Sequence, residues 1–507
     1  MVGPNFKTPP VQTTQNFKIP ATTEATTQVS GEAEVQADWW KSFNDPVLDK
    51  LVEMAYGQNL NLQSAGLRVL QARARRGIDV GNFFPQLQQV NGSYSRIGAS
   101  KNDFGYPRNG ARYFDATSSF LDVNWELDVW GKFRRGIESS DASLYSSVMN
   151  YDDALVTLVA DIATTYINLR GFDERIQLAQ QNVVVQQQAL DIANVRFKAG
   201  GATELDVQQA KVQLANTQAL VPTLQAGRDQ AEDQLCVLLG IAPTDLSDIL
   251  GHELQPMPMP PESIALGIPA DLIRRRPDIR RAEADAAAQS AQIGVAATDL
   301  LPHFQLFGSI GYSAENPGDL FNASSLAYQV GPSFRWDILN YGRIINNVRV
   351  QDARFQELLT TYQNTVLTAQ QEVADSITGM VHSREQSLYL LDSVVAAQRS
   401  VEIAMTQYKS GGADYIRVLI ATQFLVNQQD AYVLSRIDTA SSAISLNKAL
   451  GGGWEMRQGN EFVAPQTISE MRHRTNWGDV TNHNYDSGKD VIFFPRPDTN
   501  APHPNSR

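Results

Sequence analysis

Two segments of the chain alternate strictly between apolar and polar residues. From Leu121 to Val129 every odd position is apolar and every even position is polar or acidic. In the segment around Trp336 the even positions from Val330 to Ile338 form the apolar face, and Gln329, Ser333, Arg335 and Asp337 lie on the other face. A period of two is typical of a β-strand with one apolar and one polar face. Each of these segments is preceded by a weaker strand pattern. We therefore predict strands at about 86–98, 114–130, 303–313 and 327–339.

Apolar residues recur at helical spacing through two long stretches that contain no proline. One stretch runs from Phe133 to Val195, and the other lies within residues 333–464. About 65 residues of helix at a rise of 1.5 Å span roughly 100 Å, which is about three times the hydrocarbon thickness of a bilayer. We predict long helices at 133–197 and 343–408. Because their surfaces are polar, these helices should project away from the strands into water.

The strand and helix patterns occur twice in the chain, 211 positions apart and without a gap. In this register Trp125 aligns with Trp336, and Gly131 aligns with Gly342. A duplication on this scale predicts one architecture built twice. The predicted parts are an extended N-terminal arm (1–37), a first repeat (38–240), an equatorial connector (241–268), a second repeat (269–455), and a C-terminal equatorial segment with a disordered tail (456–507). The polar composition from about residue 465 predicts an extended or disordered arm there.

Each long helix ends at a glycine pair, and a return helix starts a few residues later. The pairs are Gly200-Gly201 and Gly411-Gly412, and the return helices are predicted at 203–239 and 414–450. This arrangement is typical of a tight antiparallel helical hairpin. In the first copy Thr203 and Asp206 fit a capping box. In the second copy Asp414 and Arg417 stand at those positions, so the two tips differ in charge.

Four strands per chain cannot close a membrane barrel. Such barrels begin at about eight strands, and lipid does not tolerate an open sheet edge. Three chains related by cyclic symmetry would supply twelve strands. The predicted fold is therefore an α+β membrane protein with an internal tandem duplication, in which the long helices project from a trimeric 12-stranded antiparallel β-barrel.

Composition and motifs exclude several other classes of function. A net charge of −13 and a pI near 5.0 disfavour a nucleic-acid partner. The one basic run is residues 274–276 with Arg280 and Arg281, and a helix is predicted to start within it at Pro277. We therefore expect a solvated or salt-bridged helix end and not a ligand site. Cys236 is the only cysteine, and the six histidines lack ligand spacing. No catalytic, phosphate-binding or metal motif occurs, so we expect no enzyme activity, cofactor or metal.

Membrane and targeting signals are sparse. No run of about 18 apolar residues occurs, so if the chain enters a bilayer we expect β-strands to do so. The chain starts at Met1-Val2-Gly3-Pro4 without a signal peptide, and we expect a mature or truncated form.

The duplicated strand and helix hairpins resemble the TolC/OprM family of trimeric outer-membrane efflux channels. The likeness covers about residues 38–455 and is most specific at 268–280, which resembles the drug-efflux outer-membrane lipoprotein branch. Val2-Gly3-Pro4, the segment 39–43 and the two helical tips also match. The resemblance implies an outer-membrane exit duct with its helical barrel in the periplasm. It passively conducts small molecules such as drugs when a periplasmic adaptor and an inner-membrane pump, of the RND type, open it.

The family further implies a lipid anchor and a gate. An acylated cysteine precedes the Val-Gly-Pro stretch in relatives, whereas Met1 stands there in this chain. Asp414, Tyr415 and Arg417 lie where the family closes its periplasmic entrance, and Tyr408 lies where it latches the closed tip. Ile420 replaces a frequent aspartate, which changes the charge pattern of the gate. Three copies of Asp414 would form an acidic ring that favours cations, although this residue also suits a helix N-cap.

Two further groups of residues carry expected roles. The tips are expected to contact the adaptor, although lone lysines there are more often only solvated. The even positions of the second strand and their repeat partners should face a water-filled lumen. The tip group is Lys198, Gly200, Gly201, Lys409, Gly411 and Gly412, and the lumen group is Asp122, Asn124, Glu126, Asp128, Arg335 and Asp337.

Two other functions fit the same patterns. One is an outer-membrane channel that exports secreted proteins by a type I route instead of small molecules. The other is a soluble coiled-coil scaffold whose strands form an ordinary sandwich, although the tryptophans on the strands and the helix lengths disfavour it. Extraction separates them, because a barrel needs detergent and a scaffold does not.

Overall fold

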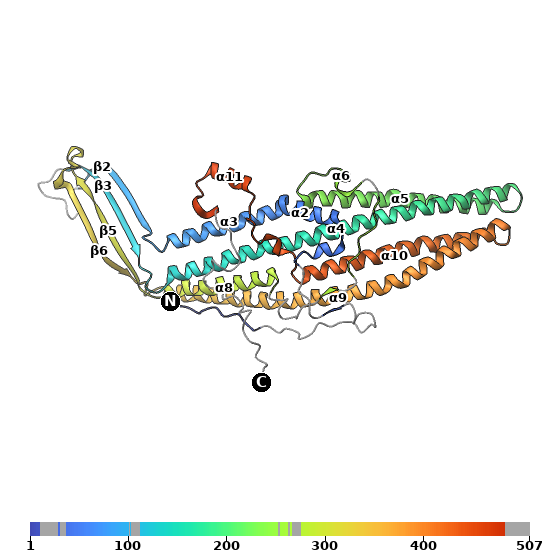
Figure 1. Ribbon diagram of the computed structural model, residues 1–507. Coiled ribbons are helices and arrows are strands. Elements are labelled where there is room, and N and C mark those ends of the chain that lie inside the picture. Colours follow the sequence, from blue (N-terminus) through green and yellow to red (C-terminus); the bar gives the residue numbers. More distant parts are fainter. Residues whose placement is uncertain are drawn as a thin grey trace, which may run out of the picture.

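The computed structural model shows an elongated chain with a sheet at one end and helical hairpins at the other (Figure 1). It describes residues 1–10, 29–30, 37–100, 102, 112–251, 254–261, 264–265 and 275–481. The predicted disordered tail beyond residue 481 and most of the arm between residues 10 and 37 lie outside the described residues. The N-terminus lies at the junction of sheet and helices (Figure 1), where Val2 N–H donates to Trp130 O at 3.0 Å.

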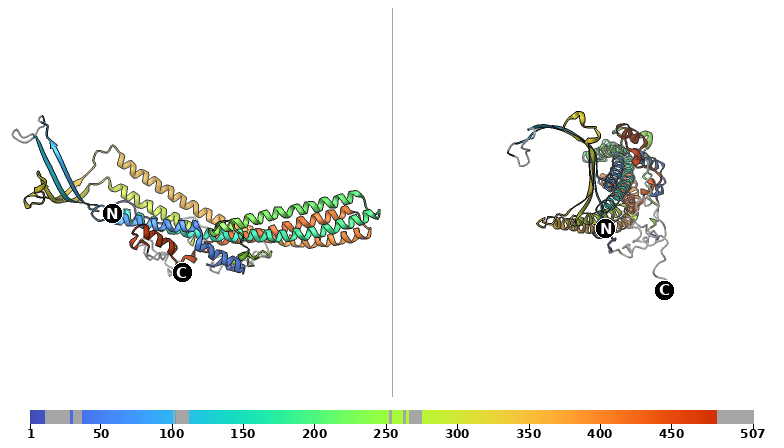
Figure 2. Two further views of the ribbon diagram at one scale, coloured as in Figure 1. Left: turned by 90° about the horizontal axis from the view of Figure 1, so that it is seen from above. Right: turned by 90° about the vertical axis from the view of Figure 1, so that its left-hand side faces the viewer.

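The sheet consists of four antiparallel strands in the order β2, β3, β5, β6, and it is strongly curved (Figure 2). Their bounds are Leu87–Gly98 (β2), Tyr113–Glu126 (β3), His303–Ala314 (β5) and Leu326–Arg335 (β6). Strand β3 pairs with β5, which belongs to the other repeat, and Asp122 lies opposite Ser309. Because β2 and β6 are both open edges within one chain, their hydrogen-bonding groups need partners from other chains.

The two faces of the sheet differ as the alternation predicts. Val90, Tyr328 and Val330 are each at least 72% exposed, and they belong to an apolar face that no other described part of the chain covers. On the opposite face, Ser93 and Ser118 share a hydrogen bond of 2.8 Å. An uncovered apolar face of this size marks a surface that contacts lipid or another protein.

Two strands end earlier than the alternation suggests. Strand β3 ends at Glu126 and not at residue 130, and β6 ends at Arg335 and not at residue 339. Asp128 explains the first difference, because its carboxylate accepts hydrogen bonds from Phe133 N–H at 3.0 Å and Arg134 N–H at 3.2 Å. The residue therefore caps the following helix instead of extending the strand.

The long helices are α4 (Lys132–Lys198) and α9 (Arg343–Ser410), and each follows a glycine with positive φ. The return helices are α5 (Glu204–Leu239) and α10 (Tyr415–Ala449). We call α4 with α5 the first hairpin and α9 with α10 the second hairpin. At the tip end the helices lie side by side in the order α5, α4, α10, α9 (Figure 1).

Shorter helices complete the wall near the sheet. Helix α3 (Leu60–Gly81) packs on α4, and α8 (Pro277–Thr298) lies between α4 and α9. Around the middle of the molecule are α2 (Pro46–Gln58), α6 (Ser247–Leu250) and the pairing of β1 (Val29–Ser30) with β4 (Ile264–Ala265). The main core lies here, where Trp39, Leu48 and Tyr166 are almost fully buried. Short 3-10 turns are η1 (Trp39–Phe43), η2 (Pro317–Asp319), η3 (Ala323–Ser325), η4 (Trp454–Arg457) and η5 (Gly478–Thr481).

The C-terminal segment corrects one expectation. Residues from about 465 were expected to form an extended or disordered arm because of their polar composition. Instead Pro465–Arg474 forms helix α11. Pro465 suits the first helical position, and Met471 is buried. A single buried anchor together with the core at Phe462 and Val463 holds this segment against the middle of the molecule.

Candidate functional site at the helical tips

The tip of the first hairpin is closed by its own turn. Gly200 turns the chain after Lys198 and has a φ of +74°, a backbone conformation that residues with a Cβ rarely adopt. Thr203 and Asp206 form the predicted capping box. Thr203 N–H donates to Asp206 Oδ2 at 3.0 Å, and Asp206 N–H donates to Thr203 Oγ1 at 3.3 Å. The start of α5 is therefore satisfied locally.

The tip of the second hairpin is capped differently. Gly411 turns the chain with a φ of +84°, and Asp414 stands at the N-cap position of α10. Its side chain nevertheless accepts no capping hydrogen bond. Asp414 and Arg417 are both exposed, and neither makes an ion pair within the part of the chain that the structure describes. These two charges are thus not used to stabilise their own helix.

Tyr408 and Tyr415 lie together between the two hairpins. They are 1% and 2% exposed, and their rings meet edge to face with centroids 5.5 Å apart. Such aromatic pairs add about 1 kcal/mol beyond the burial of their area. The Tyr408 hydroxyl is buried and has no hydrogen-bond partner among the residues that the structure describes. The cluster around them contains residues from all four helices: Ala189, Leu190, Ala193, Val207, Ala210, Leu214, Ala404 and Val418.

Burial controls the ionisation of both tyrosines. It raises the pKa of Tyr415 to about 12, and the neighbouring Tyr408 and the negative charge of Asp206 add to this shift. Burial also raises the pKa of Tyr408, with Asp206 raising it further and Arg196 opposing. Both phenols are therefore neutral across the physiological range.

Arg196 connects the two tips, and sequence reasoning missed it. Its guanidinium lies over the Tyr408 ring at 4.5 Å, donates to Tyr408 O, and donates to Gly201 O at 2.8 Å. A cation over an aromatic face is attracted by the ring quadrupole. The signal in the sequence was the repeat itself, because Arg196 aligns with Gln407 and thus marks a difference between the copies.

Polar side chains continue this contact along helices α4 and α10. Arg436 forms an ion pair with Glu174 at 2.5 Å, and Asn182 Nδ2 donates to Gln429 Oε1 at 2.7 Å. A further ion pair joins Arg175 to Asp430 at 2.6 Å. We call this line of contacts the seam. Because its members are half-buried or buried, breaking one partner leaves the other without its hydrogen bond.

The residues expected in the lumen occupy two environments. Asp122 and Asn124 lie on the polar face of β3, where Asp122 accepts from Asn91 Nδ2 at 2.7 Å. At the end of β6, Arg335 and Asp337 are mostly exposed, and their charged groups lie 4.0 Å apart.

Glu126 and Asp128 instead belong to the junction between the sheet and the helices. Glu126 Oε1 lies 2.7 Å from His303 Nδ1, and Lys132 Nζ lies 3.2 Å from Asp299 Oδ1. Together with the cap formed by Asp128, these contacts fix the angle at which α4 leaves the sheet.

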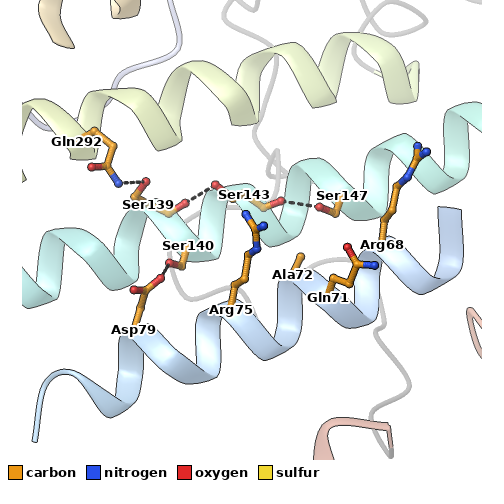
Figure 3. Close-up of a pocket in the computed structure, with 10 residues that line it drawn as sticks. All are labelled: Arg68, Gln71, Ala72, Arg75, Asp79, Ser139, Ser140, Ser143, Ser147 and Gln292. Atoms are coloured by element: carbon orange, nitrogen blue, oxygen red, sulfur yellow. Dashed lines mark hydrogen bonds between the residues drawn. The ribbon is translucent and has the colours of Figure 1, made fainter. Parts of the chain in front are cut away.

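A polar groove of about 390 Å³ lies between α3 and α4 (Figure 3). Three serines of α4 follow one another along its floor. Ser143 donates to Ser139 O at 2.9 Å, and Ser147 donates to Ser143 O at 3.0 Å. Arg75 points into the space between the helices (Figure 3). The groove is hydrophilic, as a wall in contact with water requires.

The basic run forms ion pairs, as expected. Arg276 binds Asp278 and Glu372, each at 2.7 Å, and Arg281 binds Asp153 at 3.1 Å. Pro277 is the first residue of α8, and residue 274 lies outside the described part. Cys236 is a buried free thiol.

The remaining tip residues predicted to contact a partner are solvent-exposed. Lys198 and Lys409 both lie at the ends of their long helices with exposed side chains, next to the exposed glycine pairs. Among the described residues, no cluster of histidine, cysteine or acidic side chains could hold a metal ion. No helix in the described ranges is both long and apolar enough to cross a bilayer.

Comparison with known proteins gives consistent matches over most of the chain. Residues 51–241 and 268–452 match the family described as outer membrane efflux protein. The chain is 30% identical to nodulation protein T of Rhizobium leguminosarum bv. viciae, over 94% of this chain and 93% of that protein. It is 31% identical to the pyoverdine export outer membrane protein OpmQ of Pseudomonas aeruginosa, over 83% and 88% respectively.

Solved structures show the same architecture. The outer-membrane channel OprN superposes with a TM-score of 0.81 at 29% identity, covering 90% of this chain and 99% of that one. The CmeC outer membrane channel of Campylobacter jejuni superposes with a TM-score of 0.82 at 24% identity, covering 95% and 100%. The second likeness bears on the fold alone.

Proposed function

Because this chain belongs to the outer membrane efflux protein family, we propose that its two helical tips form the gated periplasmic entrance of the channel. The predicted family and fold are confirmed: the protein is a trimeric outer-membrane channel with a β-barrel domain and a periplasmic helical barrel. It is the outer-membrane exit duct of a tripartite efflux system and works with an adaptor and a pump.

The observation that supports a gate at the tips is the contact between Arg196 and Tyr408. It joins the first hairpin to the second through a ring contact at 4.5 Å and through the Tyr408 carbonyl. No covalent link joins the described residues of the two tips, so the second hairpin can separate from the first if this contact breaks and both tyrosines leave the cluster on the first hairpin. Opening then costs a few kcal/mol, which the binding of a partner can supply.

Asp414 and Arg417 are the charges that we assign to the entrance itself. Both are exposed and unpaired within the described chain, so in a trimer each would recur three times around the axis. A ring of acids in a narrow pore favours cations and repels anions. Removing either charge should loosen the closed entrance, and unchanged conductance in both Asp414→Asn and Arg417→Gln would contradict this assignment.

The exposed turns are the surface that we propose for adaptor docking. Lys198 and Lys409 supply positive charge beside the glycine pairs, where the backbone can be approached closely because no side chain intervenes. We further propose that the pump is of the RND type, on the strength of the drug-efflux signature at 268–280. Cross-linking from the tips in intact cells, followed by identification of the captured adaptor and pump, tests both points.

Small molecules are the proposed cargo. Relatives are named for export of pyoverdine, for efflux of toluene and for efflux of antibiotics, and none of these cargoes is a protein. We propose that the chain itself catalyses no reaction and that transport energy comes from the pump.

Conductance through planar bilayers tests the gate. Wild-type trimers should give discrete ion-conducting steps, with the closed state prevailing. Arg196→Ala should raise the open fraction severalfold, because it removes the link between the hairpins. Its repeat partner provides the matched control: Gln407→Ala alters an exposed side chain and should leave the open fraction unchanged. A folded trimer that never conducts would rule out the channel, and equal behaviour of the two variants would rule out Arg196 as the link.

A further inference from the structure

The second hairpin carries an open groove between α9 and α10. Its volume is about 420 Å³, and Phe424 on its wall is 60% exposed. Exposed apolar groups of this size on a helical wall indicate a covering partner. The residues that line the groove and are used below are Ser393, Ala397, Ser400, Arg417, Phe424 and Gln428.

The same positions of the first hairpin are covered. With the 211-residue register, the groove residues align with Asn182, Gln186, Ala189, Asp206, Gln213 and Thr217. All of these except Asp206 are buried. Packing of each return helix on its own long helix cannot explain the difference, because both hairpins have that packing. The additional cover on the first hairpin is the second hairpin of the same chain.

Three side chains of the second hairpin show how this cover is made. Tyr408 and Tyr415 pack into the cluster of the first hairpin, and Gln429 accepts a hydrogen bond from Asn182. Tyr415 also lies close enough to Asp206 for that charge to raise its pKa. These contacts define one heterologous interface, in which a groove on one hairpin receives side chains from the other.

The first hairpin carries counterparts of these three side chains, and none of the described residues covers them. Phe197 aligns with Tyr408, Glu204 with Tyr415, and Gln218 with Gln429. Phe197 is 45% exposed, and Glu204 and Gln218 are exposed as well. One chain therefore has an empty groove on its second hairpin and a free set of matching side chains on its first. A heterologous surface of this kind closes into a ring when the same contact repeats between copies.

We infer that the first hairpin of a second copy seats in this groove, with Glu204 of one copy against Arg417 of the next. Phe197 then takes the place that Tyr408 has within one chain, and Gln218 lies against Ser393. The charges support this register, because Glu204 stands where Tyr415 stands and Arg417 stands where Asp206 stands. The contact between copies would thus be an ion pair at the point where, within a chain, Tyr415 lies near Asp206.

This inference rests on the trimeric channel described above and adds the residues that join its subunits at the tip. It also gives Arg417 a partner. The interface within a chain is held by Arg196 and the tyrosines, whereas the interface between chains would be held by a solvent-accessible ion pair, which is weaker and sensitive to salt. Separation of the tips would therefore begin between copies.

Paired cysteines in the full-length protein test the register. The double variant Ser393→Cys with Gln218→Cys, in a Cys236→Ser background, should form disulfides between chains on oxidation and run as covalent dimers and trimers on a denaturing gel. Asn182→Cys with Gln429→Cys is the matched control, because the same positions meet within one chain at 2.7 Å. It should remain at the mass of one chain. Absence of cross-linked species from the first pair, with an oxidised control and an intact trimer, would overturn the inference.

Charge reversal tests the ion pair by itself. Glu204→Arg and Arg417→Glu should each lower by severalfold the yield of the cross-link between Ser393→Cys and Gln218→Cys, and the two reversals together should restore it. Restoration would not follow if each substitution merely disturbed its own hairpin. Failure to restore overturns the Glu204–Arg417 pair. A failure of the channel function is seen separately, as trimers that cross-link but never conduct.

Discussion

The two hairpins follow one plan but are held by different contacts. At the first tip the aromatic residue Phe197 is 45% exposed, while its counterpart Tyr408 at the second tip is 1% exposed. Arg196 joins the hairpins, whereas its counterpart Gln407 is exposed. The duplication therefore conserved the backbone and changed the surfaces. In a trimer, identical hairpins would make six equal contacts around the ring. Because the two hairpins differ, three contacts lie within chains and three lie between chains, and the two kinds are not equivalent.

The largest difference is expected between Tyr408→Ala and Phe197→Ala. Truncating a buried aromatic residue costs about 3 kcal/mol or more through lost contacts and the cavity that remains, whereas Phe197 is half exposed within the chain. Hydrogen exchange of amides at the second tip should accelerate roughly a hundredfold in Tyr408→Ala and much less in Phe197→Ala. Equal effects would show that the two aromatic residues are equivalent after all.

High pH should weaken the contact between the two hairpins but should leave the turn of the first hairpin unchanged. Burial raises the pKa of Tyr415 to about 12, so the folded state holds this proton more tightly than the unfolded state, whose pKa is about 10. Stability from this group is complete below pH 10 and is lost as the pH rises towards 12, up to about 3 kcal/mol. The tyrosinate absorbance that Tyr415→Phe removes should therefore appear near pH 12. Its appearance near pH 10 would contradict the burial.

Asn182→Ala should destabilise the protein more than Ser393→Ala, the same change at the equivalent position of the second hairpin. The first change leaves the buried Gln429 amide without its 2.7 Å partner, which costs about 1–3 kcal/mol. Ser393 is only half-buried, and its 3.2 Å contact is with Gln428 of its own hairpin. Thermal unfolding of the detergent-solubilised trimers, followed by helix signal, compares the two. A larger loss in Ser393→Ala would show that the seam is not the tighter of the two contacts.

The smallest difference separates a capping role from a gate role. Thr203→Ala removes a hydrogen bond of the capping box and should destabilise the start of α5 by about 1 kcal/mol. Asp414→Ala removes a side chain that caps nothing, so helix stability should change by less than about 0.5 kcal/mol. Local hydrogen exchange measures both. If Asp414→Ala frays α10 as strongly as Thr203→Ala frays α5, the residue is a cap and its assignment to the entrance loses its basis.

The sequence predicted the elements well where a period is long or a glycine is required. The alternation from Leu121 gave the strand and its faces, and the glycine pairs gave the two tips. The sequence-based prediction failed where a single side chain determines where an element begins or ends. Asp128 continues the alternation but caps α4, and the polar segment after residue 464 forms helix α11 because Met471 reaches the core.

The candidate site was predicted in part. Thr203 and Asp206 form the predicted capping box, whereas the packing of Tyr408 between the hairpins is seen only in the structure. The role of Arg196 could not be predicted, because nothing local distinguishes it from other arginines near a helix end. Its partner Tyr408 lies 212 positions away in the chain. The roles of Asp414, Arg417 and the tip lysines remain predictions.

The sequence by itself determined the duplication, the strand and helix periods, the positions of the turns, and the excess of negative charge. These depend on interactions within a few residues or on composition, and each local pattern can be checked in both copies of the repeat. Only the tertiary structure decided which hairpin face is covered, because burial depends on what packs against a side chain from far along the chain. Phe197 and Tyr408 are aligned aromatic residues in aligned helices, yet within one chain only Tyr408 is buried, because it packs on the first hairpin.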